Sequence, residues 1–159
     1  MIRKVQHRTA IAVACVCFGG VAVPSASADT QRKIEIHRAL ADIYEKLGQA
    51  PSAMEQYAAL SQLAPQDASV QVQFGTLLAR QKQYKLAIDH YRRAVQLNPS
   101  PDNYGALGDG LFWAHDYKGA VDAYTRAGQR WAQKLGVARQ YYQNQIDQEN
   151  YNKQMKDRD

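Results

Sequence analysis

Apolar and small residues recur at helical spacing between Ala68 and Pro99, on both sides of a polar segment from Arg80 to Tyr84. This spacing is typical of two amphipathic helices joined by a tight turn, the second ending before Pro99. Neither helix can bury its apolar side alone, so the pattern predicts neighbouring units of the same kind. The apolar and small positions are Val72, Phe74, Gly75, Leu78, Ala87, Tyr91, Ala94 and Leu97.

The same pattern is found on both sides of this segment, at a nearly constant period. Alignment of the preceding segment superposes Leu40-Ala41, Tyr44, Ala53, Tyr57 and Pro65 on its main positions. Alignment of the following segment superposes Leu107-Gly108, Leu111, Ala120, Tyr124 and Ala127 on them. Three tandem units with one period are far more specific than a single match.

These positions resemble the tetratricopeptide repeat. Its first helix carries an aromatic residue, Leu-Gly and Tyr, and its second carries Ala, an aromatic residue, Ala and a closing Pro. The resemblance covers about residues 34–130. It implies an all-α fold, a right-handed superhelical stack of three helix pairs plus a C-terminal capping helix.

The resemblance divides the chain into three units and a C-terminal segment. The units are expected at about 34–67, 68–100 and 101–132, with a capping helix and a polar, partly disordered tail in 133–159. Asp29 and Thr30 are the expected caps of a first helix near Arg32 to Lys46. Gly136 leaves open whether the capping segment is one helix or two. Its apolar stripe comprises Trp131, Leu135, Ala138, Tyr142 and Ile146, which recur at helical spacing.

The segment 1–28 has the pattern of a secretory signal peptide cleaved after Ala28. Basic residues precede an apolar run from Thr9 to Val23, and Ala26 and Ala28 form the small-x-small pattern of a cleavage site. The alternatives are an uncleaved membrane anchor and lipidation at Cys15. The run is shorter than the roughly 20 residues that span a bilayer. We therefore expect a periplasmic or secreted protein whose precursor contacts the membrane only through this signal.

Cleavage would also change the charge and the chemistry of the chain. The net charge would fall from +5 to +2, with 17 basic and 15 acidic residues of interspersed sign, which argues against a nucleic-acid partner. Both cysteines, Cys15 and Cys17, would be lost with the signal. The glycines of the segment 105–110 lack the spacing and the following Lys-Ser/Thr of a phosphate loop. The three histidines after the signal lie on separate elements, so we expect no metal, cofactor or catalytic activity.

The resemblance instead implies a binding surface, because the first helices of such units line a concave groove. In this chain the groove would be charged at one end and aromatic at the other. A segment of a partner protein with a basic or mixed-charge stretch and an apolar anchor would suit it. The candidate partner-binding residues are Glu35, Arg38, Asp42, Glu45, Thr76, Arg80, Asp109, Phe112 and Trp113.

Phe112 and Trp113 are adjacent on a helix, so they cannot both face the same core. One could contact a partner, where Trp is often a hot spot, or both could pack against the capping helix. Tyr57, Tyr91 and Tyr124 share one position of the repeat and are expected in the core.

The family's clamp for a C-terminal carboxylate is not expected here. That clamp needs a basic residue followed four positions later by Asn, and here Arg38 is followed by Asp42. Gln73 and Ala106 occupy the positions of the next two contacts. The predicted function is a non-catalytic adaptor or scaffold of the cell envelope, an accessory of an export or assembly machine. The alternative is a carbohydrate- or cell-wall-binding module that uses Phe112, Trp113 and surface tyrosines.

Overall fold

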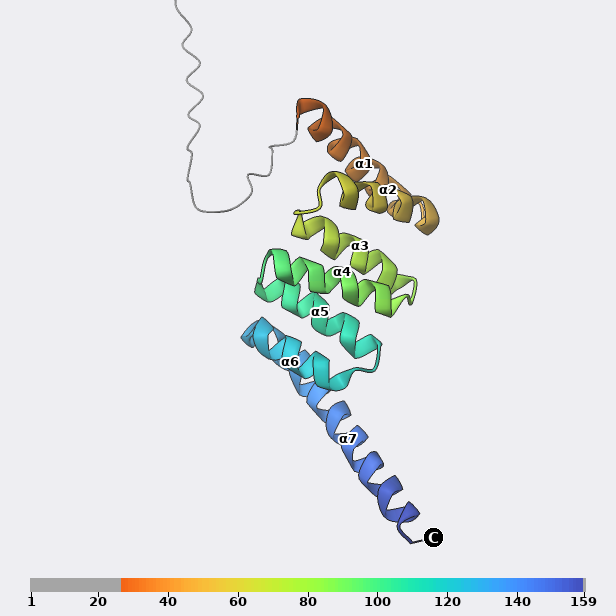
Figure 1. Cartoon of the computed structure of the whole chain (residues 1–159), viewed down its shortest axis with the longest axis vertical. Coiled ribbons are helices and arrows are strands. Elements are labelled where there is room, and N and C mark those ends of the chain that lie inside the picture. Colours follow the sequence, from red (N-terminus) through yellow and green to blue (C-terminus); the bar gives the residue numbers. More distant parts are fainter. Residues whose placement is uncertain (1–26, 159) are drawn as a thin grey trace, which may run out of the picture.

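The computed structural model describes residues 27–158, which form a stack of helices (Figure 1). The elements are α1 (Ala28–Lys46), α2 (Ala50–Leu63), α3 (Ala68–Arg80), α4 (Tyr84–Leu97), α5 (Pro101–Trp113), α6 (Tyr117–Ala127), the 3-10 helix η1 (Gln129–Trp131) and α7 (Ala132–Lys156). The predicted all-α stack of three helix pairs and a capping helix is confirmed. The predicted signal peptide lies outside the described residues, except for Ser27 and Ala28.

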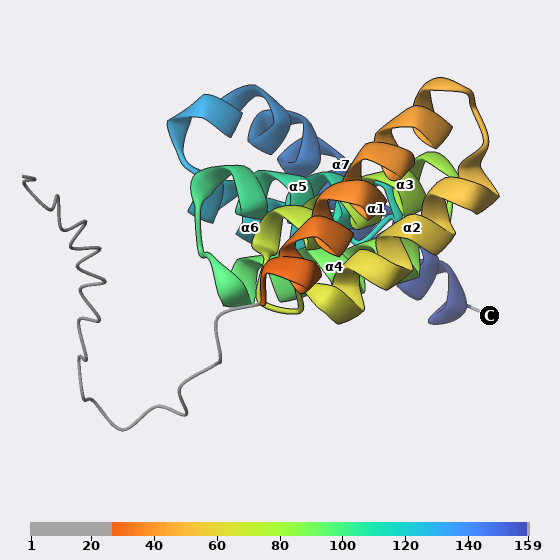
Figure 2. The same ribbon diagram turned by 90° about the horizontal axis from the view of Figure 1, so that it is seen from above.

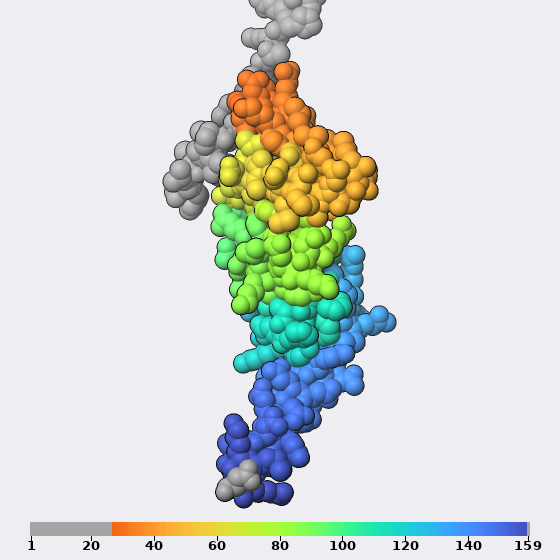
Figure 3. All heavy atoms as spheres, turned by 90° about the vertical axis from the view of Figure 1, so that its right-hand side faces the viewer, coloured from red at the N-terminus to blue at the C-terminus, as the bar shows by residue number. Residues whose placement is uncertain are grey.

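The helices follow one another in chain order along the long axis of the molecule. Within each pair the two helices pack side by side, and each pair packs on the next (Figure 1). The space-filling view shows the same order of segments from α1 at one end to α7 at the other (Figure 3). Within residues 27–158, none of the helices combines the length and the apolar composition that crossing a membrane requires.

Helix α1 begins earlier than the sequence indicated. In the uncleaved chain Ser27 is its N-cap, because the Ser27 Oγ accepts a hydrogen bond from the backbone N–H of Thr30 at 3.3 Å. Our assignment of Asp29 and Thr30 as caps was therefore wrong, and both lie in the first turn. A carboxylate is favourable there because of the helix dipole.

The helices of each pair approach closely at a small residue. A Cβ atom added to Gly75 would lie 2.8 Å from the ring of Tyr91, and one added to Gly108 would lie 2.6 Å from the ring of Tyr124. The tyrosine rings thus pack directly on the backbone of the partner helix. In the first pair Ala41 takes the same place and is fully buried.

The turn inside each pair adopts the same left-handed backbone conformation. The residues concerned are Gly48, Lys82 and His115, with φ angles of 71°, 59° and 64°. These three positions are related by the repeat period. Only the first unit has glycine, which reaches this conformation without steric cost.

The capping segment is one helix rather than two. Gly136 does not break α7, and a Cβ atom added to it would meet nothing within 4 Å. Ala138 on the first half of α7 is fully buried in a cluster with Ala123 and Tyr124 of α6. The tail that we expected to be partly disordered is helical as far as Lys156. Its residues from Asp147 onward are exposed, and this half of α7 projects beyond the stack (Figure 1).

Candidate functional site

Three neighbouring hollows lie along one face of the stack. They have volumes of about 330, 330 and 260 Å³. The first and second share Asp109 and Trp113, and the second and third share Arg80. We call this continuous surface the groove. The first hollow is lined by Asp109, Phe112, Trp113, Tyr124, Gln133, Lys134 and Val137, the second by Thr76, Ala79, Arg80, Tyr84, Tyr91, Asp109, Gly110 and Trp113, and the third by Asp42, Glu45, Lys46 and Arg80.

Most of the candidate residues from the sequence line this groove. The seven that do so are Asp42, Glu45, Thr76, Arg80, Asp109, Phe112 and Trp113. Glu35 is exposed on α1 and does not line any of the three hollows. The Arg38 Nη2 atom instead forms an ion pair with Asp67 Oδ2 at 2.9 Å, next to the start of α3. That these residues bind a partner stays a prediction.

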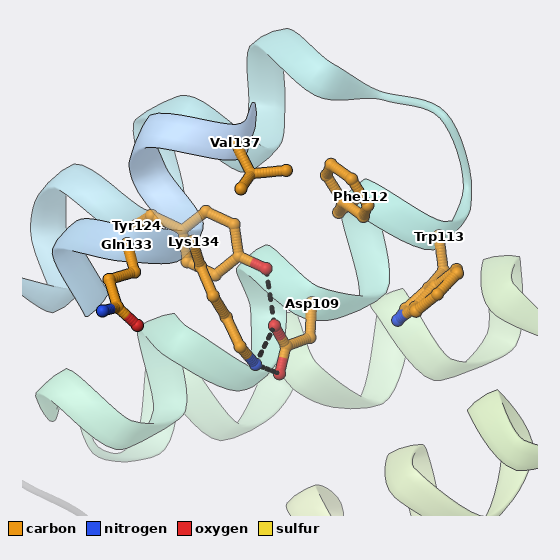
Figure 4. Close-up of a pocket in the computed structure, with 7 residues that line it drawn as sticks. All are labelled: Asp109, Phe112, Trp113, Tyr124, Gln133, Lys134 and Val137. Carbon is orange, nitrogen blue, oxygen red and sulfur yellow. Dashed lines mark hydrogen bonds and ion pairs between the residues drawn. The ribbon is translucent and has the colours of Figure 1, made fainter. Parts of the chain in front are cut away.

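Two carboxylates on the groove floor join separate helices. Glu45 on α1 accepts hydrogen bonds from the Tyr57 hydroxyl and from Arg80 Nη1 of α3, each at 2.7 Å. Asp109 on α5 accepts a bond from the Tyr124 hydroxyl at 2.5 Å, and both of its oxygens lie 2.7 Å from Lys134 Nζ of α7 (Figure 4). Each carboxylate therefore accepts a hydrogen bond from a buried tyrosine and also forms an ion pair with a basic residue of a third helix.

The tyrosines of the repeat have a polar role that the sequence analysis did not recognise. As predicted, the rings of Tyr57, Tyr91 and Tyr124 are buried in the core, with exposed fractions of 1%, 4% and 2%. Their hydroxyls nevertheless reach groove residues, and that of Tyr91 donates to Thr76 Oγ1 at 3.2 Å. The sequence contained a signal for this role, because all three positions are Tyr. A Phe ring would fill a core equally well, so three tyrosines indicate that the hydroxyl is used.

These hydroxyls remain protonated at neutral pH. Burial, and next the hydrogen bond to a carboxylate, raise the pKa of Tyr57 and of Tyr124 well above the usual value. Burial also raises the pKa of Tyr91, although its bond to Thr76 acts in the opposite direction. The tyrosines therefore act as hydrogen-bond donors that position the groove residues, rather than as acids or bases.

Phe112 and Trp113 have different surroundings. The Phe112 ring makes edge-to-face contacts with Tyr117 of α6 and Tyr141 of α7, at centroid distances of 5.5 and 5.3 Å. Trp113 is 58% exposed and lies at the edge of the first hollow, apart from the Asp109–Lys134 pair (Figure 4). Of the two alternatives, the structure supports the one in which Phe112 packs against the capping helix while Trp113 faces the groove.

The glycine-rich segment 105–110 has a structural role and does not form a phosphate loop. The glycines at 105, 108 and 110 lie directly against the rings of Trp131, Tyr124 and Tyr91. A side chain at any of these positions would collide with an aromatic ring, so the glycines serve close packing. In the part of the chain that the structure describes, no group of three or more His, Cys, Asp or Glu residues could hold a metal ion.

Comparison with known proteins supports the sequence resemblance. The family model described as "Tetratricopeptide repeat" matches residues 68–101. No curated protein sequence matches the chain significantly.

Solved structures share the fold. The MamA protein is 21% identical with a TM-score of 0.63, over 68% of this chain and 63% of that one, so this chain spans less than two thirds of its length. The first TPR domain of Spaghetti (RPAP3), bound to an HSP90 peptide, is 20% identical with a TM-score of 0.63. The match covers 69% of this chain and 92% of that domain. The TPR2B domain of yeast Sti1, in a complex with an Hsp70 peptide, is 21% identical with a TM-score of 0.58. The match covers 70% of this chain and 92% of that domain.

Proposed function

Since the chain contains a tetratricopeptide repeat within a stack of helix pairs of that fold, we propose that it is a non-catalytic adaptor. The groove holds a segment of a partner protein. The observation that carries this proposal is the continuity of the three hollows, of which the first and second share the exposed Trp113 and the second and third share Arg80. Two similar domains of known structure were solved with a bound HSP90 or Hsp70 peptide, which supports a protein segment as the occupant.

The chemistry of the groove favours a partner with an apolar anchor beside mixed charges. Trp113 borders two of the three hollows and offers a large, rigid apolar surface. The ion pairs Glu45–Arg80 and Asp109–Lys134 lie to either side of the central hollow and present both signs of charge. We do not propose capture of a terminal carboxylate, because the guanidinium of Arg38 is paired with Asp67.

Site-specific photo-cross-linking tests this proposal. A benzoyl-phenylalanine at position 113 should form an adduct with one protein partner in cells, and excess wild-type chain should suppress it. The matched control is the same probe at Tyr151, which is 57% exposed on the projecting half of α7. The purified partner should then bind Trp113→Ala at least roughly tenfold more weakly than wild type. Equal affinities would contradict the proposal.

We also propose that the adaptor acts in the cell envelope, as an accessory of an export or assembly machine. The basis is the N-terminal sequence, with its basic residues, apolar run and small-x-small site. Fractionation of cells, followed by intact-mass measurement, should recover a chain that starts at Asp29 in the periplasm or medium. A chain that retains Met1 in the membrane fraction would refute cleavage.

A second candidate function is the binding of carbohydrate. The observation that favours it is the aromatic cluster of Phe112, Trp113, Tyr117 and Tyr141, in which Trp113 and Tyr141 are about half exposed. Exposed aromatic rings are amphipathic faces on which the apolar side of a sugar ring can stack. Retardation in a gel that contains polysaccharide or cell-wall material, lost in Trp113→Ala, would favour this function over the adaptor.

A further inference from the structure

A fourth hollow lies at the edge of the stack, between the turn that joins α3 to α4 and the turn that joins α5 to α6. The pairs lie over one another when the stack is seen from above (Figure 2), so the turns inside successive pairs are neighbours along one edge (Figure 1). We call it the turn hollow, and its volume is about 500 Å³, larger than that of each hollow of the groove. It is lined by Lys82, Gln83, Tyr84, Lys85, Leu86, Trp113, Ala114 and His115.

The turn hollow is continuous with the groove. Tyr84 and Trp113 line both the turn hollow and the second hollow of the groove. Trp113 also lines the first hollow, so one exposed indole ring borders three hollows. A partner segment that packs on Trp113 in the groove therefore reaches the turn hollow without leaving the surface.

The walls of the turn hollow offer an apolar contact. Leu86 on α4 and Trp113 on α5 are large apolar side chains, and they are 52% and 58% exposed. They come from neighbouring pairs and line the same hollow. An aliphatic or aromatic side chain placed between them would remove apolar surface of both from water, which is favourable.

The turn hollow has an unbalanced charge, unlike the groove. Each of the groove's three hollows is lined by equal numbers of acidic and basic residues. The turn hollow is lined by Lys82 and Lys85, both exposed, and by no carboxylate. Within residues 27–158 neither of these lysines forms an ion pair. The turn hollow therefore attracts an acidic group and repels a basic one.

The acids nearest in the sequence to the lining residues are engaged elsewhere. Asp89 and Asp116 line a separate hollow, which Lys85 and Arg92 border as well. Asp89 Oδ1 lies 3.6 Å from Arg92 Nη1, and Asp116 Oδ1 accepts a hydrogen bond from the backbone N–H of Gly119. Together the two hollows contain three lysine or arginine residues and two acids, so a positive excess remains.

We propose that the turn hollow binds acidic side chains of the partner segment whose apolar anchor lies on Trp113. This inference rests on the proposed adaptor function and adds the charge that the partner needs beyond the groove. Carboxylates of the segment pair with Lys82 and Lys85, and an adjacent apolar side chain packs between Leu86 and Trp113. The segment therefore crosses Trp113 with mixed charges on the groove side and acids on the side of the turns.

A selection of random peptides displayed on phage tests this inference, with the full chain as the target. The enriched peptides should carry aspartate or glutamate next to an aliphatic or aromatic residue. In fluorescence anisotropy such a peptide should bind the variant Lys82→Glu/Lys85→Glu at least roughly tenfold more weakly than wild type, because like charges then meet. The same peptide with lysine in place of its acids should show the reverse preference. High salt should reduce both differences.

The control variant is Lys153→Glu/Lys156→Glu, which changes the net charge equally on the exposed end of α7 and should leave the affinity unchanged. Enriched peptides without acids, or an affinity that the charge reversal in the turn hollow leaves unchanged, would overturn this inference. If these peptides still lost affinity in Trp113→Ala, the adaptor proposal would stand. Equal affinities for Trp113→Ala and wild type would instead contradict the adaptor proposal, and no enrichment would contradict both.

Two other occupants would also be recognised, and either would overturn the inference. A dimer in sedimentation that Lys82→Glu/Lys85→Glu dissociates would place a second copy of the chain in the turn hollow. Binding to phosphatidylglycerol vesicles that the same variant abolishes, without any enriched peptide, would assign the turn hollow to a membrane surface.

Discussion

His37 on α1 and Gln56 on α2 form a hydrogen bond in which the Nδ1 and Oε1 atoms lie 2.8 Å apart. The second unit contains the same bond with the residues exchanged, since Gln71 on α3 contacts His90 on α4, also at 2.8 Å. The repeat period relates position 37 to 71 and position 56 to 90. One polar contact inside the helix pair is thus retained while its two residue types change places.

The burial of His90 makes stability depend on pH. Burial lowers the pKa of His90 below its usual value, although Asp89 acts in the opposite direction. The unfolded chain therefore binds a proton at a higher pH than the folded chain, and stability falls as the pH drops below about 6.5. Urea unfolding at pH 7.5 and 5.5 should show this loss, and His90→Gln should reduce it. An unchanged pH profile in His90→Gln would contradict the assignment.

The adjacent aromatic residues should differ in their effects. Trp113→Ala should change the free energy of unfolding by no more than about 0.5 kcal/mol, as is usual for exposed side chains. Phe112→Ala should cost about 2 kcal/mol, because Phe112 packs on α6 and α7 and leaves a cavity. Thermal unfolding followed by circular dichroism measures both. Equal losses of stability would mean that Trp113 is part of the core.

Removal of the tyrosine hydroxyls tests their link to the groove. Tyr124→Phe should cost about 1 to 2 kcal/mol, because Asp109 loses a charge-assisted hydrogen bond. Tyr91→Phe should cost less, about 0.5 kcal/mol, since its partner is the neutral Thr76 at 3.2 Å. Chemical denaturation measures the difference. The opposite order of the two losses would show that the carboxylate bond adds nothing.

Two glycine substitutions should change the free energy of unfolding in opposite directions. Gly75→Ala should destabilise the protein by about 1 to 3 kcal/mol, because the added methyl group overpacks against Tyr91. Gly136→Ala should stabilise it by up to about 1 kcal/mol, since the methyl group meets no atom and alanine favours the helix. Melting temperatures of the two variants give the test. A harmless substitution at Gly75 would argue against the close approach of α3 and α4.

The turns offer a third contrast. Lys82→Gly should stabilise the protein by about 1 kcal/mol, because the residue is held at a φ angle that only glycine adopts without strain. Gly48→Ala should destabilise it by a similar amount. Denaturant midpoints compare the two variants with wild type. Lys82→Gly without any gain would show that the long side chain offsets the backbone strain.

The repeat period accounts for what could be predicted from the sequence. Residues such as Gly75, Ala87 and Tyr91 recur because each unit buries the same contacts, so the register and most groove positions followed directly. Contacts between long polar side chains did not follow. Arg38 was placed in the groove by its position, but its flexible side chain reaches Asp67, which the period alone does not indicate.

The helix ends and the tyrosine hydroxyls were missed for related reasons. Ser27 caps α1 through a single local hydrogen bond, and Asp29 has the same propensity two residues later. Gly136 did not end α7, because a single glycine inside a helix costs only about 1 kcal/mol relative to alanine. The bond from Tyr124 to Asp109 depends on how two helices cross, which a pattern of apolar positions does not encode.

The projecting half of α7 has a consequence for how the native molecule fluctuates. From Asp147 to Lys156 the helix is exposed on all sides, so little beyond its own backbone hydrogen bonds maintains it. A short, isolated helix opens at a very small free energy, whereas α4 in the middle of the stack opens only when neighbouring layers separate. Amide hydrogens should therefore exchange within seconds at this end and far more slowly at Tyr91. A partner that bound the projecting half of α7 would be detected first as slower exchange of its amide hydrogens.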